Sequence, residues 1–269
     1  MFARRTRMRQ AVRSILAVIG LFMMIASFVW MQRTPKPEPA RLRMARPSAT
    51  PGPFAVVVLD PGHGGQDSGA MCGGVLEKDL TLDVAHRVDR LLAAEGIATV
   101  MTRLGDTYVS LAERAAFANR VSDCIFISIH FNEDNRPVST GVETYYAAHQ
   151  ITPGSFMTSW LPFLWRALSE SPNLESQSLA GFIQEALVAR TQALDRGTKA
   201  KQFFVIANVT SPAVLVEGGF LTNKEDNSRL TSEGYREQLA AAISDGILRY
   251  RGALKQRQSA VAVTAPGGR

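Results

Sequence analysis

The sequence predicts an α/β fold, a single domain with a twisted, mostly parallel sheet flanked by helices on both faces, preceded by an N-terminal membrane anchor. Short apolar runs without alternation recur along the chain, which is typical of strands buried on both faces of a parallel sheet. Helical patterns separate these runs, as expected when parallel strands are joined by crossover helices. An uncharged run of 18 residues near the N-terminus predicts the anchor.

Residues 1–33 are predicted to be a basic N-terminus and signal anchor. Five arginines precede the uncharged run 14–31, which is longer than the usual core of a signal peptide. Because no small-x-small cleavage site follows, we favour an anchor in the inner membrane over the alternative, a cleaved signal peptide. Arginines also follow the run, so the positive-inside rule orients it only weakly.

Residues 34–53 are predicted to be a linker, because they hold six of the 13 prolines and show no apolar periodicity. The excess of positive charge is confined to the residues that precede the predicted folded domain. Residues 1–50 hold ten Lys and Arg against one acid, which leaves 20 against 23 acids in residues 51–269. The folded part is therefore mildly acidic, and we expect no nucleic acid among its partners.

Residues 54–251 are predicted to form the domain, and 252–269 a disordered tail. The expected strands lie at 55–60, 97–101, 124–130, 141–146, 203–207 and 213–217. The expected helices lie at 78–96, 111–121, 176–191 and 232–250. Cys72 and Cys124 are too few for a disulfide framework and are interpreted as structural or free.

Residues 151–173 are an inserted apolar segment that holds two of the three tryptophans. Three interpretations stay open: an extra helix packed on the core, a cap over the functional site, or a contact with a membrane or a partner.

Polar residues follow three buried runs. The first run leads through the turn 60–62 to His63, whereas His130 ends the third run and Glu217 ends the last. Because parallel strands end at one edge of the sheet, these groups can converge, and Glu77 at the start of the first helix lies near the same edge. Two imidazoles and two carboxylates are typical of a catalytic zinc site with a general base.

Each of these residues also has a structural interpretation. A histidine after a glycine-rich turn is often a hydrogen-bonded structural group. Glu77 could favour the helix N-terminus through the dipole, and Glu217 could accept from neighbouring backbone amides. His86 lies on the polar side of its helix and is expected to face solvent, whereas His149 lies in a loop.

The chain resembles the zinc-dependent N-acetylmuramoyl-L-alanine amidases of the peptidoglycan amidase-3 family. The matching motifs run in family order: VVLDPGHGGQDSGA (57–70), LEKDLTLDVA (76–85), TRLGDTYVSLAERAAFAN (102–119), FISIHFN (126–132) and PAVLVEGGFLTN (212–223). The resemblance implies one zinc ion, Zn2+, held by the metal ligands His63, Glu77 and His130, with Glu217 as the catalytic carboxylate.

The resemblance also implies the reaction, which is hydrolysis of the amide between N-acetylmuramic acid and L-alanine in peptidoglycan, releasing stem peptides. A periplasmic or extracytoplasmic location and a protein activator are further expectations. Phe131 stands where the family often has a small residue, and Gly218 where threonine is common, which could reshape the substrate groove. Arg103 and Arg114 lie in matching motifs and are interpreted as partners of acids on the scaffold.

Two alternative functions stay open at this point. One is a zinc carboxypeptidase or endopeptidase that acts on the stem peptide with the same site chemistry. The other is a non-enzymatic, membrane-tethered module that binds the cell wall.

Overall fold

The computed structural model describes Met23, residues 53–150 and residues 173–264. The anchor expected within 1–33, the linker as far as residue 52 and residues 151–172 of the apolar insertion therefore lie outside the described residues, apart from Met23. Within the described ranges, no helix is both long enough and apolar enough to cross a membrane.

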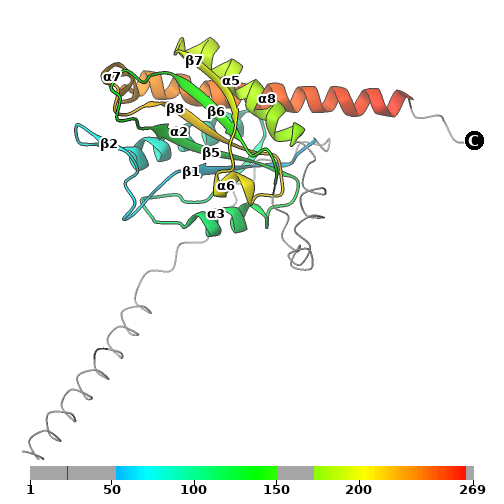
Figure 1. Cartoon of the computed structure of the whole chain (residues 1–269). Coiled ribbons are helices and arrows are strands. Elements are labelled where there is room, and N and C mark those ends of the chain that lie inside the picture. The colour runs from blue at the N-terminus through cyan, green and yellow to red at the C-terminus, as the bar shows by residue number, and fades with distance from the viewer. Residues whose placement is uncertain (1–22, 24–52, 151–172, 265–269) are drawn as a thin grey trace, which may run out of the picture. The chain divides into compact units, whose positions relative to one another are not determined.

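Six strands form the main sheet, and four of its five pairings are parallel (Figure 1). Across the sheet the order is β4 (Ala98–Met101), β1 (Val56–Pro61), β5 (Cys124–Asn132), β8 (Ala213–Phe220), β6 (Val142–Tyr146) and β7 (Asp195–Ala200). Strands β4, β1, β5 and β8 run in one direction, and β6 lies antiparallel to β8. The carboxyl ends of β1, β5 and β8 therefore share one edge, as predicted.

Helices cover both faces of this sheet, which confirms the predicted layers (Figure 1). One apolar layer joins the sheet to α2 (Glu77–Ala94), α5 (Leu174–Thr191) and α8 (Glu233–Thr264). The opposite layer joins it to α3 (Leu111–Ala118) and α6 (Phe204–Ala207). Successive side chains of a strand point to opposite faces, so Val57 and Leu59 belong to the first layer and Val58 to the second.

The start of α3 illustrates how the sequence fixes an element near the site. The Ser110 side chain accepts from the Glu113 backbone N–H, and the Glu113 carboxylate accepts from the Ser110 backbone N–H. This capping box satisfies two donors that the helix cannot pair itself. Because α3 begins there, Arg114 faces the turn that follows β1.

The prediction for residues 203–207 was wrong. These residues do not form a strand, because Phe204–Ala207 is the short helix α6, and the edge strand is β7. A short apolar run cannot be assigned to a strand or a helix from periodicity alone. The β7 sequence, DRGTKA, lacks the apolar residues that would have indicated a strand.

Helix α8 also differs from its prediction, since it continues to Thr264 where a disordered tail was expected from residue 252. Residues 253–259 are Ala, Leu, Lys, Gln, Arg and Ser, most of which favour a helix, and no proline interrupts them. Residues 265–269 lie outside the described residues.

Two further elements were not predicted, α7 (Lys224–Leu230) and a small hairpin of β2 (Met71–Cys72) and β3 (Val75–Leu76). Both cysteines are free.

Candidate metal centre

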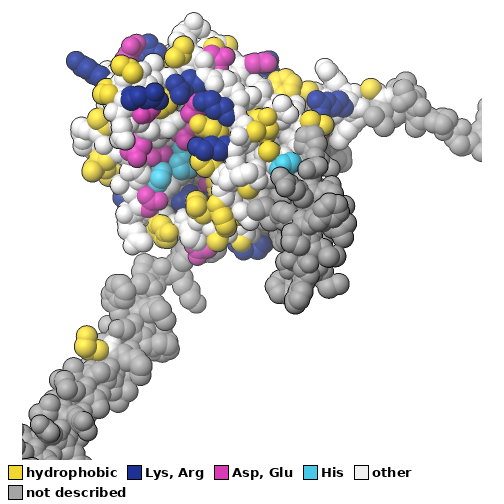
Figure 2. All heavy atoms as spheres, viewed as in Figure 1, with side chains coloured by type: hydrophobic (Ala, Val, Ile, Leu, Met, Phe, Trp, Pro, Cys, Tyr) yellow, Lys and Arg dark blue, Asp and Glu magenta, His cyan; other side chains and the backbone are white. Residues whose placement is uncertain are grey.

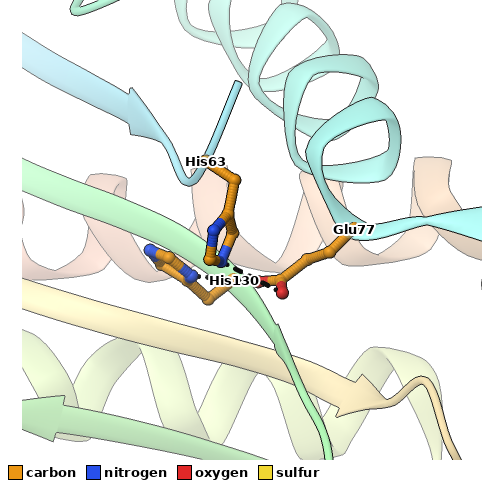
Figure 3. Close-up of side chains that lie close together, drawn as sticks. All are labelled: His63, Glu77 and His130. Atoms are coloured by element: carbon orange, nitrogen blue, oxygen red, sulfur yellow. Dashed lines mark hydrogen bonds and ion pairs between the residues drawn. The ribbon is translucent and has the colours of Figure 1, made fainter. Parts of the chain in front are cut away.

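His63, Glu77 and His130 lie together at the carboxyl edge of the sheet (Figure 3). His63 follows β1, Glu77 is the first residue of α2 and His130 belongs to β5. One potential ligand atom from each lies within 4.8 Å of the others. The two imidazole rings meet edge to face, with centroids 4.9 Å apart. The convergence expected from the strand ends is therefore observed.

Glu77 is buried and contacts both histidines with its two oxygens. Oε1 lies 2.9 Å from Nδ1 of His130, and Oε2 lies 3.1 Å from Nε2 of His63. Backbone N–H groups of Ala70 and Phe131 donate to the same carboxylate at 2.8 and 3.0 Å. Burial alone would raise the pKa of Glu77, but the two histidines hold it far below its ordinary value. The carboxylate is therefore ionised and fixed in orientation.

His63 sits in a left-handed backbone conformation, with φ of 58°. Only a few per cent of residues other than glycine adopt this region, so its neighbours must hold it there. Nδ1 of His63 lies 2.9 Å from Oδ1 of Asp67. Burial lowers the pKa of His63, but Glu77 and Asp67 together raise it above its ordinary value.

Two buried arginines hold the turn that carries His63. Nη2 of Arg114 donates to the His63 carbonyl oxygen, and Nη1 donates to the Pro61 carbonyl and pairs with Asp60 at 2.7 Å. Arg103 donates to the carbonyl oxygens of Pro61 and Gly62. Burial beside Arg114 lowers the pKa of Arg103 to about 10. Arg114 thus pairs with an acid, as interpreted, whereas Arg103 bonds mainly to backbone carbonyls.

Two glycines let the backbone close around the site. A Cβ at Gly62 would overlap the ring of His130, and a Cβ at Gly69 would overlap Glu77 and His63. Gly69 also has φ of +64°, which glycine adopts without steric cost. The glycine-rich turn in the sequence therefore reflects close packing around the imidazoles.

Glu217 lies next to this group, as the partner of His130 in the β5–β8 register. It is half-buried, and its Oε2 atom is buried without a hydrogen bond among the described residues. Burial raises the pKa of Glu217 well above its ordinary value, and the charges of Glu77 and Glu143 add to this effect, whereas Lys201 opposes it.

Glu143 is a buried residue of the same region that the sequence analysis missed. It is the cross-strand partner of Glu217 in the β6–β8 register. Its Oε1 accepts from Asn132 at 2.6 Å and from the hydroxyl of Tyr145 at 2.7 Å. An acid inside the short strand GVETYY was the available signal, since a carboxylate is costly to bury without partners.

Phe131 and Gly218, the two departures from the family pattern, contact each other on the opposite face of the sheet. Phe131 is buried in the layer that includes α8. A Cβ at Gly218 would lie 2.7 Å from Cε1 of the Phe131 ring. The large residue at 131 and the missing side chain at 218 therefore compensate for each other, and the expectation that they reshape the substrate groove is not supported.

The donor set suits zinc, which binds imidazole nitrogen and carboxylate oxygen in catalytic sites with three protein ligands. Nε2 of His63 and Nδ1 of His130 both lie within 3.1 Å of the Glu77 carboxylate, which two backbone amides hold in place. These features fit a preformed cation site. His86 is exposed, as expected, and His149 lies outside the group.

The N-acetylmuramoyl-L-alanine amidase family model, Amidase_3, matches residues 57–249. LytC, an N-acetylmuramoyl-L-alanine amidase of Bacillus subtilis (strain 168), is 38% identical over 194 residues. That match covers 72% of this chain and 35% of LytC, so the chain spans about a third of that relative.

Two solved amidase structures are similar to this chain over nearly their whole length. An N-acetylmuramoyl-L-alanine amidase from Clostridium difficile 630 has a TM-score of 0.63 and 32% identity, over 74% of this chain and 98% of that structure. The amidase AmiC2 of Nostoc punctiforme has a TM-score of 0.60 and 37% identity, over 75% of this chain and 98% of that structure.

Proposed function

Because this chain belongs to the Amidase_3 family of peptidoglycan N-acetylmuramoyl-L-alanine amidases, we propose that His63, Glu77 and His130 hold its zinc ion and that Glu217 moves the protons of the reaction. The observation that carries this proposal is the convergence of two imidazoles and a buried carboxylate beside a second carboxylate. The reaction is hydrolysis of the amide between N-acetylmuramic acid and L-alanine.

Zinc bound in such a site polarises the scissile carbonyl and lowers the pKa of the attacking water. The chain supplies the geometry around it. The backbone amides of Ala70 and Phe131 fix the Glu77 carboxylate. The arginine contacts to the turn after β1 fix the position of His63.

Glu217 is the proposed general base and then general acid. Its carboxylate accepts a proton as the water oxygen bonds to the carbonyl carbon, and it returns that proton to the alanine nitrogen as the C–N bond breaks. A raised pKa suits this role, because the group must both accept and release a proton near neutral pH. Oε2 of Glu217 accepts no hydrogen bond within the described part of the chain, so this oxygen is available to take up the proton.

We further propose that the enzyme is anchored in the inner membrane by residues 1–33, with the Pro-rich linker between the anchor and the domain. Cell-wall amidases act outside the cytoplasm, and the basic, apolar N-terminus supports this placement. Fractionation of cells that produce the full chain tests it: the protein should stay with membranes in high salt and be released by detergent. A protein in the soluble extracytoplasmic fraction that has lost residues 1–33 would contradict it and would support a cleaved signal peptide.

Digestion of purified peptidoglycan by the zinc-loaded full chain tests the reaction. Mass spectrometry should find intact stem peptides and glycan with unsubstituted muramic acid. Shortened stem peptides would instead indicate a zinc peptidase, and the absence of products would favour a binding module. Glu77→Gln should lose both zinc and product. Glu185→Gln, an exposed carboxylate of α5, is the matched control and should keep both.

A further inference from the structure

The edge strand β7 and the residue after it bring three cations to the face of the sheet that carries Glu217. Arg196 and Lys199 belong to β7, and Lys201 follows it and extends the strand pairing through its N–H bond to the carbonyl of Tyr146. In Figure 2, Lys and Arg side chains gather close to histidine side chains on one face of the molecule. The strand was not predicted, so the sequence analysis assigned these residues no role.

A row of paired residues connects these cations with the candidate metal centre. His130 of β5 pairs with Glu217 of β8, which pairs with Glu143 of β6. The Glu143 carboxylate in turn contacts Arg196 at 2.9 Å and Lys199 at ion-pair distance. The cations therefore lie on the far side of Glu217 from the histidines.

The charges in this cluster do not cancel. Arg196 and Lys199 share the carboxylate of Glu143, and Glu217 is a second carboxylate on this face, so the three cations exceed the two carboxylates by one charge. Lys201 is exposed and has no carboxylate at ion-pair distance among the described residues. Its ammonium lies over the ring of Phe203 at 4.5 Å and that of Tyr145 at 5.5 Å, which hold it in place without neutralising it.

The spacing matches a short extended peptide. Neighbouring strands lie about 4.8 Å apart, so β7 is roughly 10 Å from the strand that carries Glu217. An extended peptide advances about 3.3 Å per residue, so the third residue after the scissile amide lies at that distance, and the second lies about 3 Å short of it, within the length of a carboxylate side chain. A carboxylate on such a peptide is the group that lysine and arginine side chains at this distance would bind by charge-assisted hydrogen bonds.

We propose that Arg196, Lys199 and Lys201 form a subsite that receives a carboxylate of the second or third residue of the stem peptide. This proposal rests on the proposed function. It places the stem peptide on the side of Glu217 that lies away from the histidines. Arg196 and Lys199 already form ion pairs with Glu143, so Lys201 is the cation that is available to pair with the carboxylate of the substrate. The subsite selects substrates whose carboxylates are free over those in which they are amidated.

Kinetics of the zinc-loaded full chain with two matched muramoyl tripeptides test the subsite. In one the second- and third-residue side-chain carboxylates are free, and in the other they are carboxamides. The wild type should prefer the free acid by about tenfold in kcat/KM, mainly through KM, which is the size of one charge-assisted hydrogen bond. Lys201→Met should abolish this preference, because kcat/KM for the free acid should fall by about tenfold more than kcat/KM for the carboxamide. Lys201→Arg should restore it.

Lys255→Met, which removes an exposed lysine of α8, is the control and should keep the preference. Equal cleavage of both substrates by the wild type, or an equal loss on both in Lys201→Met, would overturn the subsite. Calorimetry with the free acidic tripeptide and its carboxamide separates this proposal from the reaction itself. A chain that cleaves neither substrate but binds the acid more tightly, through Lys201, would contradict the proposed function and retain the subsite.

Discussion

Arg114 donates a hydrogen bond from Nη2 to the backbone carbonyl oxygen of His63 over 2.6 Å. The other end of the same guanidinium pairs with the buried carboxylate of Asp60. Asp60 also accepts from the hydroxyls of Ser128 and Thr102. One planar guanidinium therefore links the Asp60 carboxylate of β1 to the backbone of His63. This link helps to hold His63 in its unfavourable left-handed conformation.

Replacement of Arg114 should cost both stability and zinc affinity. Arg114→Met leaves Asp60 as a buried charge without its partner, which should lower the free energy of unfolding by about 3–5 kcal/mol. Arg114→Lys keeps a charge for Asp60 but cannot bond to Asp60 and to the His63 carbonyl with one rigid fork.

Urea unfolding and zinc competition with a chelating dye measure the two effects separately. Arg114→Lys should lose more zinc affinity than its change in stability accounts for. Arg120→Met, an exposed arginine just beyond the end of α3, should change neither quantity. Unchanged zinc binding in a folded Arg114→Lys variant would show that the arginine serves stability alone.

Glu217→Gln should separate catalysis from metal binding. The kcat should fall by about 10²–10⁴-fold, the usual contribution of a general acid–base group. Zinc content should stay the same as in the wild type. Stability should not fall, because one oxygen of Glu217 is buried without a hydrogen-bond partner in the described part of the chain. Substantial activity in this variant, measured by release of stem peptides, would exclude the proposed role.

The contact between Phe131 and Gly218 should appear as strong coupling in a double-mutant cycle. Gly218→Thr places a side chain against the Phe131 ring and should cost about 1–3 kcal/mol by overpacking. In a Phe131→Ala background the added side chain has room, so its cost should shrink or change sign. Additive effects on the free energy of unfolding, within about 0.5 kcal/mol, would show that the two positions do not compensate.

Acid stability should depend on Asp83, which joins α2 to α8. Burial alone would raise its pKa, but hydrogen bonds from Arg87 and Arg236 hold the pKa of Asp83 below its ordinary value. A lowered pKa in the folded state stabilises the protein above the unfolded pKa, and this contribution is lost as the pH falls below about 4.

The variant Asp83→Asn lacks this contribution at every pH. It should be less stable than the wild type at pH 7, and its free energy of unfolding should decline less steeply between about pH 5 and pH 2. Glu185→Gln, which removes one side of an exposed ion pair, should follow the wild-type curve. Parallel curves for Asp83→Asn and the wild type would contradict the expected linkage.

The central strands and the convergence of the site were predictable because both follow from local patterns. Uninterrupted apolar runs, of which the first leads to His63 and the others end at His130 and Glu217, indicate buried parallel strands, and such strands end at one edge. Glu77 begins the first helix, which must return over the same edge. The assignment of zinc required the family motifs in addition, because each residue has a structural alternative.

The far side of the site was not predictable because its pairing depends on contacts distant in sequence. β7 holds its place through pairing with β6 and through the ion pairs of Glu143, not through apolar alternation. The match between Phe131 and Gly218 likewise joins residues 87 positions apart in the chain. The sequence pattern within one strand or helix does not indicate which distant residues will contact it.

X-ray absorption at the zinc edge of the full chain, loaded with one equivalent of zinc, tests the central claim most directly. We predict a first shell of nitrogen and oxygen at about 2.0–2.1 Å, with the outer-shell scattering of two imidazoles. Glu77→Gln should lose this signal. A sulfur scatterer at about 2.3 Å, as binding by a cysteine such as Cys72 would give, or a shell with fewer than two imidazoles, would contradict the assignment of His63, Glu77 and His130.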